Sequence, residues 1–458
     1  MKKILVLLTI FAWVLVGCED ILDTQPYDGV PSDEAITNAR GVENAINGCY
    51  SAMQSVGYYA RHYIVFGDLA ADNLTWTGTH DGYDQVNRNS ILADNVHVEG
   101  IWSSIYTAIN RVNNVVVQIP GVEDMDQDSK NEAIAELRFL RALHHYNLMR
   151  MFGPIPVRTE PATEEEESLN VPRVSITTED EESLSVLDQI NSDLDFAIEN
   201  MSPVIFRGRA SRAAAEALKA RVSLHEYFIN DDISHLEDAV TYSTNVIDNY
   251  NLELETDFGF LFSGESNTES IFEVAFTEVE DNRLSFYFFP TSMSGRREIA
   301  PTQSLFDSYA DDDERRDVSI QMDGEDLYGN KYTDIETGTD NVYVFRLAEM
   351  YLIRAEAEAL MEGDVDQIQS DINEIRERAG LLETTVSNYD VLLLEIETQR
   401  RKEFAFEGHR WFDLVRTNRA IDVLENVNDV YQTLFPIPLS ELLANDHEGM
   451  YQNDGYGN

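Results

Sequence analysis

Residue types that commonly perform hydrolysis or hold a catalytic metal occur in this sequence without the spacing that such chemistry needs. The nine histidines form no H-E-x-x-H zinc pattern, and His144 and His145 are neighbours in an expected helix, so they point to different faces. No G-x-S-x-G elbow and no phosphate-binding loop occur. Paired carboxylates can cleave a glycosidic bond, but among 84 Asp and Glu residues no pair stands out. The sequence therefore predicts a protein that is not an enzyme and that needs no cofactor.

A calcium site is the one metal alternative. Asp323-Gly324-Glu325-Asp326 offers carboxylate oxygens, but the spacing misses the EF-hand pattern. We predict no metal, with calcium at this turn left open.

Binding chemistry is better supported, in two stretches rich in Gly, Asn, Asp and aromatic residues. Sugar rings pack their C–H faces on aromatic rings, and their hydroxyls need amides, carboxylates or guanidinium groups at the edge. Residues 57–96 and 251–345 combine these types, with short β-like runs at Ser270–Phe276 and Leu284–Phe289. Long irregular segments in a folded protein often mediate its function. The candidate ligand-binding residues are Arg61, Asp72, Asn73, Trp76, Tyr83, Tyr287, Phe289, Arg296 and Tyr328, with Arg297 and Tyr332 in the same stretches.

Trp76 is the most distinctive of these residues. Of the four tryptophans, Trp13 lies near the N-terminus, and Trp102 and Trp411 lie in expected helices where core packing is the simpler role. Trp76 alone falls in a loop. It either stacks on a ligand or packs its loop against the rest of the protein.

The remainder of the chain is predicted to be helical, in pairs. Ser129-Lys130-Asn131-Glu132 has the spacing of a capping box that opens a helix ending before Gly153-Pro154, and Thr178-Glu179-Asp180-Glu181 opens another that runs to about Asn200. Further expected helices span Ile101–Ile119, Ser211–Phe228, Leu236–Ile247, Leu347–Met361 and Val365–Ala379. The last two, with their turn, cover about 33 residues, close to a tetratricopeptide repeat. A generic helical bundle is the alternative.

The N-terminus reads as a secretion signal. Lys2 and Lys3 precede an apolar run, Ile4–Val16, which is shorter than the roughly 20 residues a spanning helix needs. The sequence Leu15-Val16-Gly17-Cys18 resembles a bacterial lipobox, in which the cysteine receives lipid; an ordinary signal peptide is the alternative. Multiple acyl chains anchor a protein stably. We therefore divide the chain into a signal (1–17), an acidic tether after lipidated Cys18 (18–31) and a body (32–458).

The formal net charge of −51 excludes nucleic acid as a partner, because such a surface repels phosphate backbones. Within the body we expect a helical scaffold at about 32–56, 97–250 and 346–416, with the two loop-rich stretches inserted in it.

Several segments resemble the SusD/RagB family of outer-membrane lipoproteins. They are Ala135–Leu143, Arg346–Ala357, Ile372–Gly380, Arg400–Leu414 and Leu434–Pro438, in the family's order. Gln399 departs from the family, which often has Glu there. The resemblance implies a mostly α, tetratricopeptide-like scaffold with a loop-rich, minor-β ligand-binding subdomain. It also implies a surface-exposed, lipid-anchored outer-membrane protein that partners a SusC-like TonB-dependent transporter.

The charged residues of these segments are expected to be structural. Arg400, Glu403, Glu407 and Arg410 are three or four residues apart, the spacing of intrahelical ion pairs. Arg376 and Arg378 lie near a helix end, where they would offset the helix dipole.

Three functions remain open. The first is non-catalytic binding of an oligosaccharide or polysaccharide and its delivery to the transporter for glycan uptake. The second is peptide binding within the same family. The third is a lipid-anchored glycan hydrolase.

Overall fold

The computed structural model describes residues 36–163, 171–178, 184–264, 266–445 and 449–457. Helices account for 54% of the described residues and strands for 7%, which confirms the mostly α fold. Cys18, the signal and the tether lie outside the described residues. Among the helices that can be described, none is long and apolar enough to cross a membrane.

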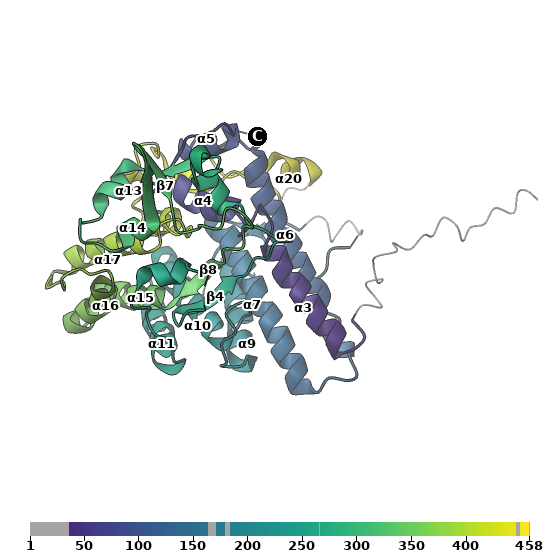
Figure 1. The fold of residues 1–458 in the computed structure, drawn as a ribbon. Coiled ribbons are helices and arrows are strands. Elements are labelled where there is room, and N and C mark those ends of the chain that lie inside the picture. Colours follow the sequence, from purple (N-terminus) through teal and green to yellow (C-terminus); the bar gives the residue numbers. More distant parts are fainter. Residues whose placement is uncertain (1–35, 164–170, 179–183, 265, 446–448, 458) are drawn as a thin grey trace, which may run out of the picture.

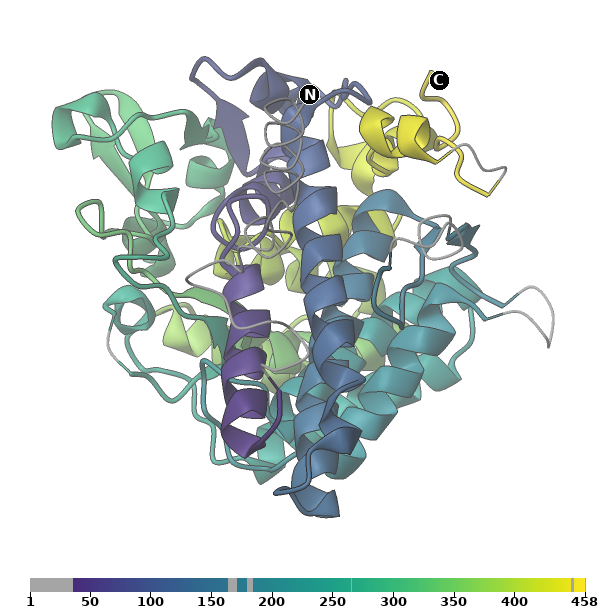
Figure 2. The same cartoon turned by 90° about the vertical axis from the view of Figure 1, so that its right-hand side faces the viewer.

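Three long helices lie side by side along one flank of the molecule (Figures 1 and 2): α3 (Ala39–Met53), α6 (Val96–Val116) and α7 (Gln127–Phe152). α7 begins at Gln127, two residues before the predicted start at Ser129, because the Asp126 side chain already accepts the Ser129 N–H at 2.8 Å. Its predicted end is confirmed, since Gly153 follows Phe152 with φ = 76°, a conformation that glycine adopts without strain.

A second group of helices stacks behind α7 as antiparallel pairs. It contains α9 (Val186–Asn200), α10 (Arg212–Asn230), α11 (Ser234–Asn249), α15 (Leu347–Leu360) and α16 (Val365–Arg378). The contacts run in order from α7 to α9, α10 to α11, α11 to α15 and α15 to α16. The predicted pair around Gly363 is thus confirmed. Small residues such as Ala355 and Ala359, both buried, allow these helices to approach closely.

The start of α9 differs from the expectation. Ser185 and Asp188 form the capping box that opens it, whereas most of the predicted box at Thr178–Glu181 lies outside the described residues.

The described strands form four antiparallel pairs. They are β1 (Leu74–Trp76) with β5 (Ile299–Pro301), β2 (Ile155–Pro156) with β3 (Arg173–Val174), β4 (Ser270–Val274) with β8 (Val342–Arg346), and β6 (Ile320–Asp323) with β7 (Asp326–Gly329). The β-like run at Ser270–Phe276 is confirmed as β4. The run Leu284–Phe289 is instead a short helix, α12 (Leu284–Phe288): Asn282 accepts the Leu284 N–H at 3.1 Å, a local bond that favours a helical start over a strand.

The remaining helices are short except α17, which is as long as α3. They are α4 (His62–Leu69), α5 (Asp81–Asn87), α13 (Gln303–Ser308), α14 (Arg315–Ser319), α17 (Tyr389–Glu403), α18 (Arg410–Arg416), α19 (Ala420–Val423) and α20 (Leu439–Ala444), with 3₁₀ turns at Ile119–Gly121, Phe258–Phe262, Thr291–Met293 and Val430–Thr433. α4 and α5 lie beside β7 and α13 at one end of the molecule (Figure 1).

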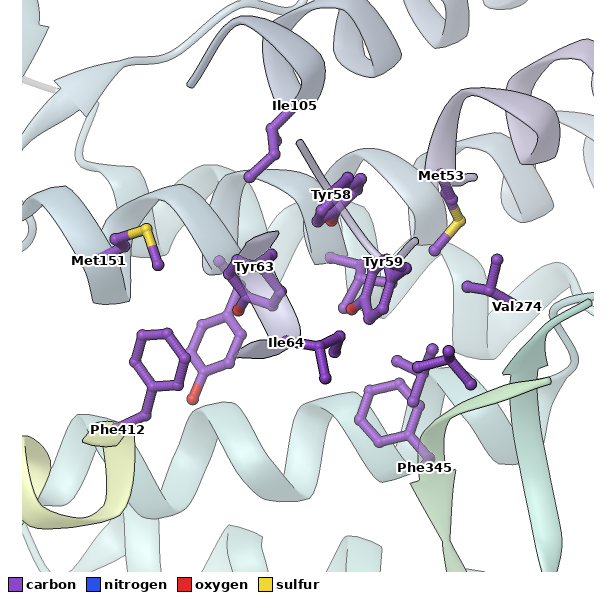
Figure 3. Packing of buried hydrophobic residues seen from close by; sticks show 14 of the residues in the cluster. Met53, Tyr58, Tyr59, Tyr63, Ile64, Ile105, Met151, Val274, Phe345 and Phe412 are labelled. Atoms are coloured by element: carbon purple, nitrogen blue, oxygen red, sulfur yellow. The ribbon is translucent and has the colours of Figure 1, made fainter. Parts of the chain in front are cut away.

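A buried tyrosine cluster fastens α4 to the scaffold. Tyr58, Tyr59 and Tyr63 are at most 2% exposed and lie over α7 in Figure 3. The Asn147 amide of α7 donates to the Tyr58 and Tyr59 hydroxyls at 2.7 and 3.0 Å and accepts from Tyr63 at 2.7 Å. Buried hydroxyls need such partners, so this arrangement holds the beginning of the first stretch, 57–96, against the scaffold.

A buried ion cluster joins β4, β8 and α14 to the helices α16 and α17. Its core is formed by four cations and four carboxylates, Arg315, Lys331, Arg346 and Arg378 with Glu269, Asp313, Glu403 and Glu407. Lys402 adds a fifth cation at its edge, 3.9 Å from Asp313. The β4–β8 pairing places Ser270 opposite Arg346, which brings Glu269 within 2.6 Å of the Arg346 guanidinium.

The prediction of intrahelical ion pairs was therefore wrong. Glu403 and Glu407 pair with the cluster, Arg400 pairs with Asp413, and Arg410 pairs with Asp72 and Glu397. The physical reason is that α17 ends at Glu403: Phe406 and Gly408 have φ values of 69° and 78°, so no single helix passes through all four positions.

Arg376 and Arg378 were both expected to act at the helix end, and only Arg376 does so. Arg376 donates to the Leu382 carbonyl beyond the helix end at 2.8 Å, whereas Arg378 belongs to the ion cluster. Gln399, at the position where Glu was expected, accepts from Arg315 at 2.9 Å.

Candidate functional site

The pairing of β1 with β5 brings the two loop-rich stretches together. Trp76 lies opposite Ile299 in this ladder, and Leu74 lies opposite Pro301. Residues more than 200 positions apart in the sequence thus share one surface, at the end of the molecule where α4 and α5 lie (Figure 1). We call the group Arg61, Trp76, His80, Tyr83, His97, Tyr287, Arg296 and Glu298 the aromatic site.

Glu298 organises this site. It has no exposed surface, and its Oε1 accepts from the Trp76 indole N–H at 3.1 Å and from the backbone N–H groups of Thr79 and His80 at 2.7 Å each. Burial alone would raise the pKa of this carboxyl, but the His80 N–H, the Arg296 guanidinium and the Thr79 N–H hold it below its usual value. Glu298 is therefore ionised and fixes the loop 77–80.

Gly78 makes this approach feasible. A Cβ atom on Gly78 would lie 2.1 Å from the Glu298 carboxyl carbon, closer than any real contact, so only glycine fits here.

Tyr287 forms the floor of the site. The Arg61 guanidinium lies over its ring at 4.0 Å from the centroid, and the His80 and Tyr83 rings lie at centroid distances of 6.3 and 6.1 Å, both nearly parallel to it. The Arg61 Nε is buried and has no hydrogen-bond partner among the described residues.

Arg296 and the histidines complete the polar edge. Arg296 donates to Glu298 at 2.7 Å and to the Thr79 hydroxyl at 2.9 Å, and about a third of its side chain is exposed. Burial, followed by His80 and Arg61, lowers the pKa of His97 to about 4, so this ring is neutral at pH 7. The site offers partly exposed rings beside two guanidinium groups, which suits a neutral, hydroxylated ligand.

The structure brings five of the nine predicted residues together here: Arg61, Trp76, Tyr83, Tyr287 and Arg296. Tyr83 is fully buried, so its role is to support Tyr287 from beneath. Trp76 is partly exposed and hydrogen bonded through its indole nitrogen, so it packs the loop and also presents a ring face.

Asp72 and Asn73 lie just before β1 and hold it to the C-terminal helices. Asp72 accepts from Arg410 at 2.7 Å and pairs with Arg401 at 3.1 Å. Asn73 has no exposed surface, donates to Asp68 at 2.7 Å and accepts from Arg401 at 3.1 Å. With their polar groups engaged in this way, we assign them a positioning role.

Phe289 and Tyr328 form a separate edge-to-face pair, 5.1 Å between centroids, where α12 meets β7. Both rings are largely buried. Nearby Arg297 pairs with Asp326 at 3.0 Å, whereas Tyr332 is buried and donates to the Phe406 carbonyl. This second pair borders the aromatic site without joining it.

Sequence reasoning missed Glu298, His80 and His97. Glu298 is one of 84 acidic residues, and nothing in its neighbours indicates that its carboxylate is buried. His80 follows the run Asn73–Thr79 and was detectable only as a polar residue near Trp76.

No group of three or more His, Cys, Asp or Glu side chains among the described residues is arranged to hold a metal. The turn Asp323–Asp326 joins β6 to β7, where Asp323 accepts from Ser292 and Asp326 pairs with Arg297.

A large hollow, about 590 Å³, lies elsewhere, between α3, α7 and residues 201–210. Its lining combines aliphatic side chains and exposed Phe206 with Glu43, Glu132 and Glu136. We place the functional site at the aromatic site instead, because carbohydrate-binding surfaces depend on ring faces with neighbouring donors more than on enclosed volume.

Comparisons with known proteins cover most of the chain. The family model described as "SusD family" matches residues 323–456, and the one described as "Starch-binding associating with outer membrane" matches residues 20–224. SusD-like protein P2 from Formosa agariphila is 26% identical, with 100% of each chain covered. Among solved structures, a laminarin-binding SusD-like protein and surface glycan-binding protein A from Bacteroides fluxus each align with a TM-score of 0.79 at 26% identity, over 92% of this chain and 100% of theirs.

Proposed function

We propose, from the premise that this chain belongs to the SusD family, that it binds an oligosaccharide or polysaccharide at the aromatic site and passes it to a transporter in the outer membrane. The two family models confirm the family resemblance that was inferred from the sequence. SusD family proteins bind ligands without catalysis, which agrees with the prediction that this chain is not an enzyme.

The observation that supports glycan binding most directly is the surface around Trp76. Trp76 is partly exposed, Arg296 is about a third exposed, and both are bound to Glu298, whereas Tyr287 is buried beneath Arg61. A sugar ring can place its C–H face on the Trp76 ring while a hydroxyl accepts from Arg296. Two structural relatives bind glycans according to their descriptions, one of them laminarin, so a laminarin-type β-glucan is the first ligand to test.

The delivery step rests on the family and on the N-terminus. The family description places its members in association with the outer membrane. A lipid on Cys18 would keep the body at that membrane, exposed on the cell surface, where a SusC-like TonB-dependent transporter could receive the ligand. Palmitate labelling of the full chain expressed in a Bacteroidota host, lost in Cys18→Ala, tests the anchor; equal labelling of both proteins would contradict it. Co-purification of the transporter tests the partner.

Calorimetry on protein lacking residues 1–18 tests the site. Laminarin hexasaccharide is titrated into the wild type and into Trp76→Ala, Trp76→Phe and Phe206→Ala. Trp76→Ala is expected to weaken binding about tenfold, equivalent to ~1.4 kcal/mol. Trp76→Phe keeps a ring but loses the bond to Glu298, so its affinity should lie between that of the wild type and that of Trp76→Ala.

Phe206→Ala is the matched control, because Phe206 is an exposed ring in the large hollow. Its affinity should equal that of the wild type. Loss of binding in Phe206→Ala with unchanged affinity in Trp76→Ala would move the site to the large hollow. If a panel of glycans all failed while peptides bound, the peptide alternative would replace the glycan one.

A further inference from the structure

A small polar cavity lies at the junction of α7, α10, α15, α17 and α18, within the scaffold and away from the aromatic site. Its volume is about 20 Å³, room for a single water-sized particle. Four guanidinium groups and two carboxylates line it: Arg150, Arg221, Arg400 and Arg416, with Glu349 and Asp413.

Three of these arginines have carboxylate partners. Arg221 binds Glu349 through two contacts of 2.7 and 2.5 Å. Arg416 binds Glu356 at 2.6 and 2.8 Å, and Arg400 binds Asp413 at 2.9 Å.

Arg150 has no carboxylate partner among the described residues. Its guanidinium donates to the Tyr63 hydroxyl at 2.7 Å and to the Asn147 amide oxygen at 3.0 Å, and it lies over the Phe412 ring at 4.0 Å from the centroid. Four cations thus face three carboxylates, Glu349, Asp413 and Glu356. A positive charge of one is left over in the interior of a protein whose net charge is −51.

The two histidines that line the cavity do not change this balance. Burial, followed by Arg416 and Arg150, lowers the pKa of His225 to about 3. Burial, followed by Arg221 and Arg400, lowers the pKa of His409 well below its usual value. Both rings are therefore neutral at pH 7, chiefly because they are buried, and add no charge to the cavity.

One donor of an arginine that lines the cavity is unused. Arg400 is 5% exposed, and its Nη1 is buried without a hydrogen-bond partner among the described residues. A buried donor without a partner costs free energy, and for a charged group the cost is greatest. The orphan donor and the surplus charge adjoin the same cavity.

We propose that this cavity is a binding site for a monatomic anion, chloride in practice, held by the Arg400 Nη1 donor. A single negative charge cancels the surplus positive charge of Arg150 and satisfies Arg400 at once. Sulfate, phosphate and carboxylate-bearing metabolites are too large for the volume. A water molecule would satisfy the donor but would leave the charge uncompensated.

Bromide crystallography of the wild type lacking residues 1–18 tests the proposal directly. Crystals grown in sodium bromide and measured at the bromine absorption edge should show an anomalous peak in the cavity, within contact distance of Arg400. Density without an anomalous signal would mean a water molecule and would overturn the proposal.

Thermal unfolding gives an independent readout. A ligand that binds only the folded state raises the melting temperature, and gluconate is too large to enter. Wild type in sodium chloride should therefore melt roughly 2–4 °C higher than in sodium gluconate of equal ionic strength. Equal melting temperatures in the two salts would contradict chloride binding.

Arg150→Met removes the surplus charge and should abolish this difference. Arg212→Met is the matched control, since Arg212 also lacks a carboxylate partner in the described part of the chain and bonds instead to the Met201 carbonyl at 3.1 and 2.9 Å, outside the cavity. It should keep the chloride response in full. A response that survives in Arg150→Met would refute the charge argument, and should that variant fail to fold, the bromide experiment on the wild type still decides.

Discussion

Replacing Glu403 with Gln tests how strongly the buried ion cluster stabilises the fold. The Glu403 carboxylate accepts from Arg378 at 2.5 Å, from Arg346 at 2.9 Å and from Arg315 at 3.3 Å. All of these side chains are at most 3% exposed. Gln has nearly the same shape, so the substitution removes a charge without opening a cavity.

The expected loss follows from the charge balance. Glu403 is one of four carboxylates in the cluster and pairs with Arg378, Arg346 and Arg315, so Glu403→Gln leaves three carboxylates to offset these cations, Lys331 and Lys402. Removing one partner of a buried ion pair costs about 3–5 kcal/mol. Since a folded domain is stable by about 5–15 kcal/mol, this variant should lose a large part of its free energy of unfolding.

Urea unfolding followed by tryptophan fluorescence measures this loss. The matched control is Glu383→Gln, because Glu383 is exposed and such a change should stay within about 0.5 kcal/mol. Arg378→Met in the Glu403→Gln background removes one of the cations that Glu403 pairs with and should recover part of the loss. If Glu403→Gln were no less stable than Glu383→Gln, the assignment of the cluster as a stabilising core would be refuted.

The pH dependence has a defined sign. Although burial raises it, Arg378, Arg346 and Arg315 hold the pKa of Glu403 well below its usual 4.5. A carboxyl whose pKa is depressed in the folded state stabilises the protein above pH 4.5, and this stability is lost as the pH falls below that value. The stability curves of wild type and Glu403→Gln should therefore converge in acid; a constant gap down to pH 2 would contradict this account.

Three further predictions concern other residues. Gly78→Ala should displace the loop from Glu298 and weaken glycan binding in calorimetry, whereas Gly121→Ala, where a Cβ meets nothing within 4 Å, should not; equal affinities would contradict the role of Gly78. Burial raises the pKa of Asp68 from 3.8 to about 7. Its contribution to the free energy of unfolding is therefore complete below pH 3.8 and is lost as the pH rises through 7, by up to about 4 kcal/mol. Asp68→Asn should remove this loss in unfolding measured from pH 4 to 8, and an unchanged pH slope would count against it. Cys49 is 1% exposed and burial raises the pKa of its thiol to about 12, so in protein lacking residues 1–18 a thiol reagent should label it only in urea, and rapid labelling of the folded protein would disprove its burial.

Helices were predictable where local signals act alone. The apolar spacing and the Gly153 stop located α7, and Gly363 located the turn between α15 and α16, because caps and periodicity are properties of neighbouring residues. The starts of helices were less predictable: Asp126 competes with Ser129 as a cap only three residues away. The helix at Leu284–Phe288 was missed because its aromatic residues favour strands, although the local bond from the Leu284 N–H to Asn282 supports a helical start.

Partners of charged residues were not predictable in the same way. The spacing of Arg400, Glu403 and Glu407 assumes one continuous helix, and that assumption fails at Phe406, whose φ is positive. Once the helix ends, each charge finds a partner distant in the sequence. Glu403 reaches Arg346, 57 positions away, and no local pattern specifies such a contact.

The same contacts explain how the scaffold positions the candidate site. Arg401 and Arg410, from the C-terminal helices, both bind Asp72, which lies two residues before β1. Asp68, in α4, accepts from the Gly408 N–H at 2.8 Å and from Asn73, so the turn between α17 and α18 is linked through Asp68 to the residues just before β1. Asp72 and Asn73 were selected from the sequence as ligand contacts, but their bonds fix where β1 begins. Since Trp76 ends that strand, a change in this C-terminal turn should shift the glycan-binding surface even though no residue of the turn belongs to it.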